Sequence, residues 1–299
     1  MRILVSGKNS QIGQKLFFYT KDSSHNFYFL DSNDMDLADP KKIKNVVSHY
    51  KPNIVINLSA YTDVDAAEKN INKVEIINSF GPKYLAQASN SIDAYFIQIS
   101  TDYVFGRNSS GPYSSFSNTG PLNAYGLSKL KGEKNVLYSN KKSLIIRTSS
   151  LFSEYGNNFV KLVAKKLIHN EHLRVISDQT ISMTYVDDFV EALLVLLDKK
   201  RLDSVILKET PSIIHYTNDE YTTWFDVANE ILHNLNNTYK SLGTITPIPY
   251  SEWSSEAIRP KDSRLLIDYS LLSSLNIKLK PWKPQIKKVL SKINFDKVD

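Results

Sequence analysis

The chain has 299 residues, of which 41% are hydrophobic and 23% are charged, a composition typical of globular proteins with one large domain or two smaller ones. It contains no cysteine and no apolar run of about 18 residues, which excludes disulfides, thiol nucleophiles, cysteine-ligated zinc and a membrane span. The net charge of +6 comes from 37 basic and 31 acidic residues spread in ones and twos, which favours attraction of small anions over nucleic-acid binding.

The first half of the chain carries short apolar runs of strand length. The N-terminal run, residues 3–5, lacks the length and cleavage site of a secretory signal, so we expect a cytoplasmic protein. The runs are residues 3–5, 27–30, 54–58, 95–99 and 144–146. Runs of this kind suit strands buried on both faces, and the stretches between them are long enough for crossover helices. The pattern predicts an α/β fold with a doubly wound parallel sheet.

The second half of the chain has helical spacing of its apolar residues. Residues 159–168, 186–197 and 224–232 follow this spacing, and Thr223 with Asp226 predicts the start of the last of these helices. Proline and aromatic residues punctuate residues 246–260, which predicts irregular surface structure there. The Ser/Asn-rich residues 107–119 predict a long loop.

A glycine turn follows the first predicted strand. Gly7 and Gly13 flank Ser10, and a helix is predicted to begin directly after them. At a turn from strand to helix, small residues let backbone N–H groups approach a pyrophosphate, and the helix N-terminus adds partial positive charge. Dinucleotide binding and a plain tight turn both remain open for this motif.

Asp31 stands at the end of the second predicted strand. A carboxylate in this position can accept hydrogen bonds from an adenosine ribose and repels a 2′-phosphate, so it favours NADH without excluding NADPH. A turn-forming aspartate is the alternative interpretation.

Tyr125 and Lys129 are four residues apart and therefore share one face of a helix. Tyrosine titrates near ~10, so it is a poor acid–base group at neutral pH unless a nearby cation favours its phenolate. Lys129 can supply that cation, and Thr101 adds a hydroxyl at the end of the fourth strand. An ordinary exposed Tyr–Lys pair is the structural alternative.

With these motifs in place, the chain resembles the extended short-chain dehydrogenases/reductases, and within them the dTDP-4-dehydrorhamnose reductase family. The segments that carry the resemblance run in family order over almost the whole chain: residues 57–68, 100–105, 121–129, 147–149, 156–159, 178–179, 222–224 and 259–265. The resemblance implies a Rossmann-like dinucleotide-binding core of residues 1–149 and about 185–217. A smaller C-terminal α/β part, residues about 150–184 and 218–299, would bind the sugar nucleotide.

The resemblance also implies roles for individual residues. Tyr125 would be the catalytic acid, Lys129 would bind the nicotinamide ribose and lower the pKa of the tyrosine, and Thr101 would hydrogen-bond the reacting oxygen. The cofactor contacts would come from Gly7, Ser10, Gln11, Ile12, Gly13, Asp31, Asp36, Leu37, Ser59, Ala60, Tyr61 and Lys129. The substrate contacts would come from Asp102, Tyr103, Asn158, Arg259 and Ser263. A helix or turn cap is the alternative for Asp102, and a surface salt bridge is the alternative for Arg259.

The activity implied is reduction, by NADPH or NADH, of the 4-keto group of a nucleotide-linked 6-deoxyhexose, with dTDP-4-dehydro-L-rhamnose as the expected substrate. Such an enzyme serves the synthesis of cell-surface polysaccharides. Two alternatives stay open: a sugar-nucleotide epimerase or dehydratase of the same superfamily, and a non-catalytic NAD(P)-binding regulatory subunit. We expect no nucleic-acid or membrane partner, and a homodimer remains open.

The chain departs from the family pattern at several positions. Ser10 replaces a middle glycine, and Ser150 stands where the family commonly has a tryptophan beside the sugar. Lys15 stands where some members have a glutamate that helps to bind magnesium, so we predict no metal site. Residues 181–184 replace a stretch that contains glycine and proline. We therefore expect a substrate pocket of altered shape around unchanged chemistry.

Overall fold

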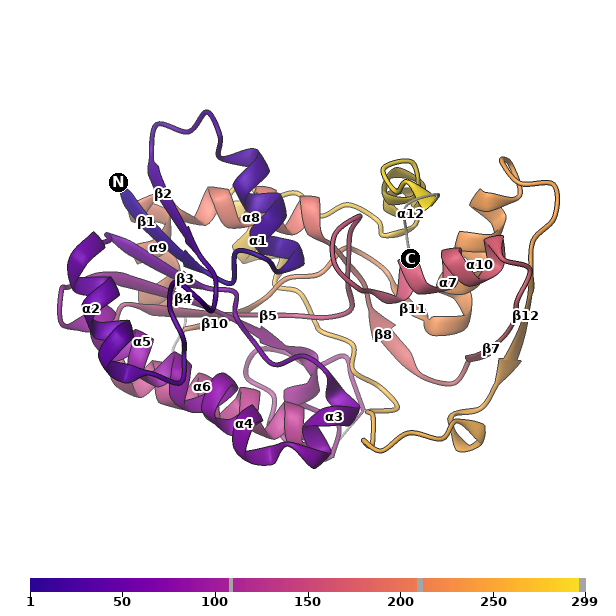
Figure 1. Cartoon of the computed structure of the whole chain (residues 1–299), viewed down its shortest axis with the longest axis horizontal. Helices are drawn as coiled ribbons and strands as arrows, with labels where there is room; N and C mark the ends of the chain where they lie inside the picture. The colour runs from indigo at the N-terminus through magenta and orange to yellow at the C-terminus, as the bar shows by residue number, and fades with distance from the viewer. Residues whose placement is uncertain (108–109, 209–211, 296–299) are drawn as a thin grey trace.

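The computed structural model describes residues 1–107, 110–208 and 212–295. Within these residues, six strands form one parallel sheet in the order β10-β5-β4-β3-β1-β2 (Figure 1). The strands are β1 (Arg2–Ser6), β2 (Asn26–Leu30), β3 (Ile54–Asn57), β4 (Tyr95–Thr101), β5 (Ser143–Thr148) and β10 (Ile213–His215). The five predicted runs all fall on strands of this sheet, which confirms the predicted α/β fold.

One expectation about these strands is wrong. The apolar run of β2 was expected to be buried on both faces, yet Phe27, Tyr28 and Phe29 are only half-buried. The reason is the position of β2 at the edge of the sheet, where it has β1 as a neighbour on one side.

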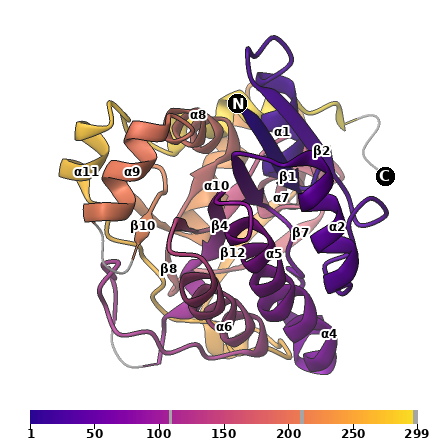
Figure 2. The same cartoon turned by 90° about the vertical axis from the view of Figure 1, so that its left-hand side faces the viewer.

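Helices cover both faces of the sheet because successive strand residues point to opposite sides. Ile3 and Val5 of β1 pack on one face, with α1 (Gln11–Tyr19) and α8 (Val186–Leu196). Leu4 packs on the other face, with α2 (Pro40–Tyr50), α5 (Gly81–Asn90) and α6 (Ala124–Ser139). Figure 2 shows these layers with the left-hand side of Figure 1 turned toward the viewer. The sheet is therefore doubly wound.

Six further helical segments of the described chain complete this core. They are α3 (Val64–Lys69), α4 (Ile71–Glu75), a π-helical turn (Ile76–Phe80), a 3-10 turn (Asp102–Val104), α9 (Lys199–Lys208) and α11 (Tyr269–Ser274). The 3-10 turn follows β4 without a break, so it lies at the carboxyl end of a central strand.

A smaller second part packs around its own apolar cluster, which includes Leu167, Ile231 and Trp282. Its helices are α7 (Phe159–Ile168), α10 (Trp224–Leu235) and α12 (Lys283–Leu290). Its strands form three pairs: β11 (Tyr221–Thr223) with β8 (Thr180–Ser182), β12 (Thr244–Ile248) with β7 (His172–Ile176), and β6 (Leu151–Phe152) with β9 (Thr184–Tyr185). Figure 1 places this part beside the carboxyl end of β5.

The helices predicted in the second half are confirmed, and the Thr223 hydroxyl accepts the Asp226 N–H at 3.1 Å, as expected of a helix start. The prediction of irregular structure over residues 246–260 is wrong at its beginning. Pro247 lies inside β12, which tolerates it because each strand of a two-stranded ribbon keeps a free edge. Residues 110–119 form the predicted loop, while 108 and 109 lie outside the described residues. Among the described helices, none is long and apolar enough to cross a lipid bilayer.

Candidate active site

The glycine turn lies where the sheet changes direction. The chain leaves β1 toward β2 on one side and returns to β3 on the other, and such switch points are where open α/β sheets bind ligands. Gly7 has a φ of +84°, and a Cβ on it would lie 2.7 Å from the backbone of Leu58 and Ser59. A Cβ on Gly13 would lie 2.3 Å from the Gly7 carbonyl oxygen. Both positions therefore require glycine.

Ser10 is the N-cap of α1. Its hydroxyl accepts the Gly13 N–H at 3.0 Å, so the side chain is folded back onto the helix start. The residue that replaces the middle glycine thus satisfies an N–H group that would otherwise lack a partner. Ile12 is buried against the sheet and contributes packing at this turn.

The other predicted cofactor residues lie along the same edge. The Asp31 carboxylate accepts the N–H groups of Asn33 and Asp34 at 2.9 and 3.3 Å, which is the turn-forming role. The Ser59 hydroxyl donates to Ser6 at 3.1 Å, and Asn78 binds both backbone groups of Tyr61.

The remaining predicted cofactor residues are Asp36, Leu37 and Ala60. The Asp36 carboxylate accepts the Ala38 N–H at 2.9 Å, and Leu37 is buried directly against Gly81. Ala60 lies between the anchored residues Ser59 and Tyr61.

Gln11 and Asn158, predicted for cofactor and substrate respectively, meet each other. The Gln11 side-chain oxygen accepts from Asn158 at 3.1 Å and from Ser153 at 2.8 Å. Asn158 is also the N-cap of α7, where its oxygen accepts the Lys161 N–H. These two side chains join the glycine turn to the second part of the molecule.

Tyr125 stands in the first turn of α6, whose N-cap Asn123 accepts the Gly126 N–H at 2.8 Å. A Cβ on Gly126 would lie 2.2 Å from the Tyr103 carbonyl oxygen, so glycine lets the helix approach the 3-10 turn. This approach sets the rings of Tyr103 and Tyr125 edge to face, with centroids 5.9 Å apart. The Thr101 side chain lies close enough to Tyr125 to act on its phenol, where it lowers the pKa against the effect of burial. The structure thus brings Thr101, Tyr103 and Tyr125 together.

Burial raises the pKa of Tyr125 to about 12, and the nearby Asp102 carboxylate acts in the same direction. This direction is opposite to the lowering that the resemblance implies. The Lys129 ammonium donates to the Ile99 carbonyl oxygen at 2.7 Å, which directs it at β4. Burial lowers the pKa of Lys129 to about 8, while the Glu133 carboxylate opposes this change.

Asp102 is buried under this group of side chains. Its carboxylate accepts the Thr101 hydroxyl at 3.0 Å and the Ser149 hydroxyl at 2.8 Å. Burial raises the pKa of Asp102, and the hydrogen bonds from Ser263, Ser149 and Thr101 act against that rise. Ser263 therefore lies near Asp102.

Arg259 reaches the same place from the second part. Its guanidinium binds both oxygens of Asp65, on α3, at 3.1 and 2.6 Å, and its charge opposes the rise that burial causes in the pKa of Tyr103. The salt bridge expected as the alternative is present, and it lies against a residue of the candidate site.

The sequence analysis assigned no role to two sets of buried residues: Glu133 with its partners, and Ser149. Arg147 binds both oxygens of Glu133, at 2.9 and 2.7 Å, and Ser100 donates to the same carboxylate. Glu133 follows Lys129 by four residues, the same spacing that singled out Tyr125, so this signal was available. Ser149 lies in the segment 147–149 that carries the resemblance, but it was not assigned a role.

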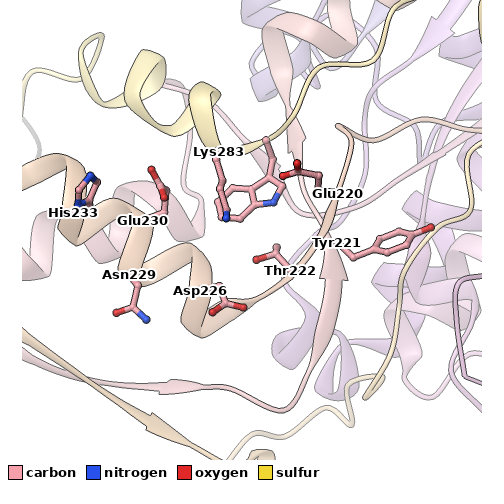
Figure 3. A pocket seen from close by; sticks show the side chains of 9 residues that line it. Glu220, Tyr221, Thr222, Asp226, Asn229, Glu230, His233 and Lys283 are labelled. Atoms are coloured by element: carbon pink, nitrogen blue, oxygen red, sulfur yellow. The ribbon is translucent and has the colours of Figure 1, made fainter.

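Two features lie apart from this site. Lys15 pairs with Glu154 at 2.5 Å and with Asp187 at 2.8 Å. A cavity of about 550 Å³ opens on the second part, where Figure 3 shows Asp226, Asn229 and Glu230 on one wall. Its lining is Glu220, Tyr221, Thr222, Asp226, Asn229, Glu230, His233, Trp282 and Lys283, and this set contains no predicted site residue.

A doubly wound sheet with a glycine turn at its switch point, a Tyr–Lys pair on one helix and a hydroxyl at the adjacent strand end defines an oxidoreductase of the extended short-chain dehydrogenase/reductase class. Comparison with known proteins narrows this class. The family model for the RmlD substrate binding domain matches residues 1–295.

Individual relatives agree with this match. The spore coat polysaccharide biosynthesis protein SpsK of Bacillus subtilis is 34% identical, over 86% of this chain and 90% of its own. The dTDP-4-dehydrorhamnose reductase of Escherichia coli K12 is 30% identical, over 98% of both chains. A solved reductase of this name from Clostridium acetobutylicum superposes with a TM-score of 0.87, at 31% identity, over 98% of this chain and 99% of that one. The chain belongs to the dTDP-4-dehydrorhamnose reductase family, which confirms the predicted resemblance.

Proposed function

We propose that this chain is a cytoplasmic, NAD(P)H-dependent reductase of the 4-keto group of a nucleotide-linked 6-deoxyhexose, with dTDP-4-dehydro-L-rhamnose as the foremost substrate. The observation that carries the proposal is that Thr101, at the carboxyl end of β4, and Tyr125, in the first turn of α6 against Tyr103, lie at the same edge of the parallel sheet as the glycine turn after β1. Relatives that cover nearly the whole chain are named for this reaction.

The chain offers a fitting site for a nicotinamide dinucleotide, and the reductase of Bacillus anthracis, 30% identical with a TM-score of 0.85, is solved in complex with NADP. Backbone N–H groups at the start of α1 would hold the pyrophosphate, in the turn that Gly7 and Gly13 keep tight. Asp31 would lie toward the adenosine ribose and Lys129 toward the nicotinamide ribose. The cofactor, when bound, supplies a hydride for the ketone carbon.

Tyr125 and Lys129 share the proton chemistry. Because the pKa of Tyr125 is raised to about 12, the phenol keeps its proton at neutral pH and can give it to the oxygen that gains charge during reduction. Because the pKa of Lys129 is about 8, most molecules carry its positive charge at neutral pH. That charge stabilises the phenolate left behind.

Substitution of the acid tests the proposal. Tyr125→Phe should lower kcat by roughly 10²- to 10⁴-fold, the usual contribution of a positioned general acid, while the affinity for NADPH stays unchanged. The measurement is the loss of NADPH absorbance with purified protein and a 4-keto-sugar. Tyr138→Phe is the matched control, because Tyr138 lies on the same helix and is 83% exposed. Full activity of Tyr125→Phe would refute the assignment of the acid.

The substrate itself is tested with a panel of dTDP-, UDP- and GDP-linked 4-keto-sugars, each with NADH and NADPH. The panel includes 6-deoxyhexoses of other configurations because the chain is also similar to SpsK and because the Ser150 side chain is small. An epimerase or dehydratase would instead turn over without added reductant. A regulatory subunit would bind the cofactor in calorimetry and reduce none of the sugars.

A further inference from the structure

Three buried polar side chains lie in a row across three neighbouring strands of the sheet. The strand register pairs Ser6 of β1 with Asn57 of β3, and Asn57 with Gln98 of β4. The residues two positions earlier on each strand pack in the cluster that includes Val136 of α6, so the three side chains lie on the face that α6 covers. They are 2%, 0% and 3% exposed. Polar groups buried this deeply are costly unless each has a hydrogen-bond partner.

A continuous series of hydrogen bonds, here called the amide network, satisfies these side chains. The Ser6 hydroxyl donates to the Asn57 side-chain oxygen at 2.5 Å. The Asn57 amide group donates to the Gln98 side-chain oxygen at 2.8 Å, and the Gln98 amide group donates to the Ile99 carbonyl oxygen at 2.8 Å. The network ends at Lys129, whose ammonium donates to the same carbonyl oxygen at 2.7 Å.

Main-chain groups fix the direction of the amide network at both ends. The Ser59 N–H can only donate, so the atom of Asn57 that it meets at 3.2 Å is the oxygen. The Ile99 carbonyl can only accept, so the atom of Gln98 that it meets is the nitrogen. Gln98 therefore presents a donor at this point, and its own oxygen does not compete with Ile99 for the protons of Lys129.

The Ile99 carbonyl oxygen is held by two side chains. Ile99 is the first residue of β4 beyond its register with β3, which ends at Gln98. A carbonyl oxygen has two lone pairs, and here Gln98 and Lys129 each supply a donor to it. The position of this oxygen thus depends on Gln98 at the point where β3 no longer pairs with β4.

The ammonium of Lys129 has three N–H groups. Among the described residues, its hydrogen-bond acceptor is the Ile99 oxygen, which leaves two N–H groups for other acceptors. Lys129 is only 5% exposed, so it has little freedom to reorient. The direction of the two remaining N–H groups therefore depends on where the Ile99 oxygen lies.

We propose that Gln98 is a positioning residue for Lys129: held by Asn57, it fixes the Ile99 carbonyl oxygen that anchors the ammonium, and so directs the remaining N–H groups of Lys129 for the hydroxyls of a nicotinamide ribose. Gln98 acts only through Ile99 and Lys129. This inference rests on the proposed function, because it assumes that Lys129 holds this ribose.

A double-mutant cycle on cofactor affinity tests this role. Gln98→Met keeps the length of the side chain and removes both of its hydrogen bonds, and Lys129→Met removes the group that Gln98 positions. In titration calorimetry, Gln98→Met should bind NADPH roughly tenfold more weakly than the unmodified protein, because a hydrogen bond from a charged group is lost from its aligned position. In the Lys129→Met background, Gln98→Met should have no further effect on this affinity.

Asn140→Leu is the matched control. Asn140 is 1% exposed, and its amide group donates at 3.0 Å to the Ala94 carbonyl oxygen, which lies just before the opposite end of β4. The loss of this buried amide should lower stability in urea denaturation, as Gln98→Met does, and should leave the affinity for NADPH unchanged.

A second variant is available if Gln98→Met does not fold. Adding Asn57→Leu to Gln98→Met replaces both partners of the amide–amide hydrogen bond, so the Asn57 amide is no longer left buried without an acceptor. The expected results are the same, with this pair of substitutions in place of Gln98→Met.

Three results would overturn the inference. The first is a Gln98→Met variant that binds NADPH as tightly as the unmodified protein. The second is an equally large effect of Gln98→Met in the Lys129→Met background, which would mean that the amide network acts through Ser6 on the glycine turn. The third is an equal loss of affinity in Asn140→Leu, which would mean that stability alone controls cofactor binding.

Cofactor binding and sugar reduction are separate measurements, so the inference and the proposed function can fail separately. If the cycle shows the expected coupling and no keto-sugar is reduced, the reductase function fails and the inference stands. If keto-sugars are reduced and the two substitutions weaken NADPH binding independently, the inference fails and the function stands. An unmodified protein that binds neither NADPH nor NADH would overturn both.

Discussion

Lys129 is the group through which pH should act on the reaction. Its pKa is lowered to about 8 by burial, whereas that of Tyr125 is raised to about 12, also by burial. As pH rises through about 8, the lysine loses its charge, and under the proposed mechanism the phenolate of Tyr125 then loses its stabilising cation. We therefore expect kcat/KM to fall above about pH 8, long before the phenol ionises.

The profile should be measured from about pH 6 to about pH 10, which brackets this transition of the free enzyme. Lys129→Met should be slower throughout and should lack the alkaline decline, because methionine does not titrate. An alkaline decline that persists unchanged in Lys129→Met would assign it to another group.

Spacing along the chain identified Tyr125 and Lys129, since residues four apart share a helix face. It could not show that Asp102 is buried under hydroxyls, nor that Arg259 pairs with Asp65, because those partners are far apart in sequence. The sequence could not show the direction of the pKa shift of Tyr125 either. It depends on burial, which tertiary packing decides.

The N-cap of α6 carries a second function beyond starting a helix. Asn123 accepts the Gly126 N–H and donates to the Ile258 carbonyl oxygen, both at 2.8 Å. Asn123→Ala should therefore lower the free energy of unfolding by about 1 kcal/mol, the usual loss of an N-cap, and should also lower kcat by loosening the helix turn that carries Tyr125.

Thr223 provides the matched control for the loss of an N-cap. It caps α10, away from Tyr125, through the Asp226 N–H. Thr223→Ala should cost a similar ~1 kcal/mol in urea denaturation and leave kcat unchanged. Equal losses of kcat in both variants would show that stability, and not the position of Tyr125, controls the rate.

Elements with long apolar patterns were predicted well, as α7 shows with the same bounds in sequence and structure, residues 159–168. The strand pairs of the second part were not predicted. β6 and β9 have two residues each, too few for any periodicity, and they are strands because they find each other in the folded chain. β12 was not predicted because it contains Pro247, and proline is rare inside strands.

At the scale of the whole molecule, a network of charged side chains joins the core to the second part. Lys15 of α1 pairs with Glu154, which follows β6, and with Asp187 of α8. Lys292, beyond α12, binds the same Asp187. Burial alone would lower the pKa of Lys15, but hydrogen bonds to Asp187 and Glu154 outweigh it and raise that pKa.

Removal of this lysine should be far more costly than removal of a surface lysine. The Lys15 side chain is 4% exposed, so Lys15→Met leaves two carboxylates buried with less compensating charge, which should cost about 3–5 kcal/mol of unfolding free energy near neutral pH. Lys142→Met is the control, because its pair with Asp93 is exposed to solvent and should contribute little to the free energy of unfolding.

The pH dependence of that loss tests its electrostatic origin. Burial would raise the pKa of Asp187, but hydrogen bonds from Lys15, Lys292 and Tyr185 lower it overall. A carboxylate with a lowered pKa stabilises the fold above its unfolded pKa and loses that contribution as pH falls through the folded value. Lys15→Met removes part of this lowering, so its deficit in urea denaturation should be large near neutral pH and should shrink in acid. A deficit that stays constant across that range would instead mean that lost packing of the lysine stem, and not unpaired charge, weakens the junction between the two parts.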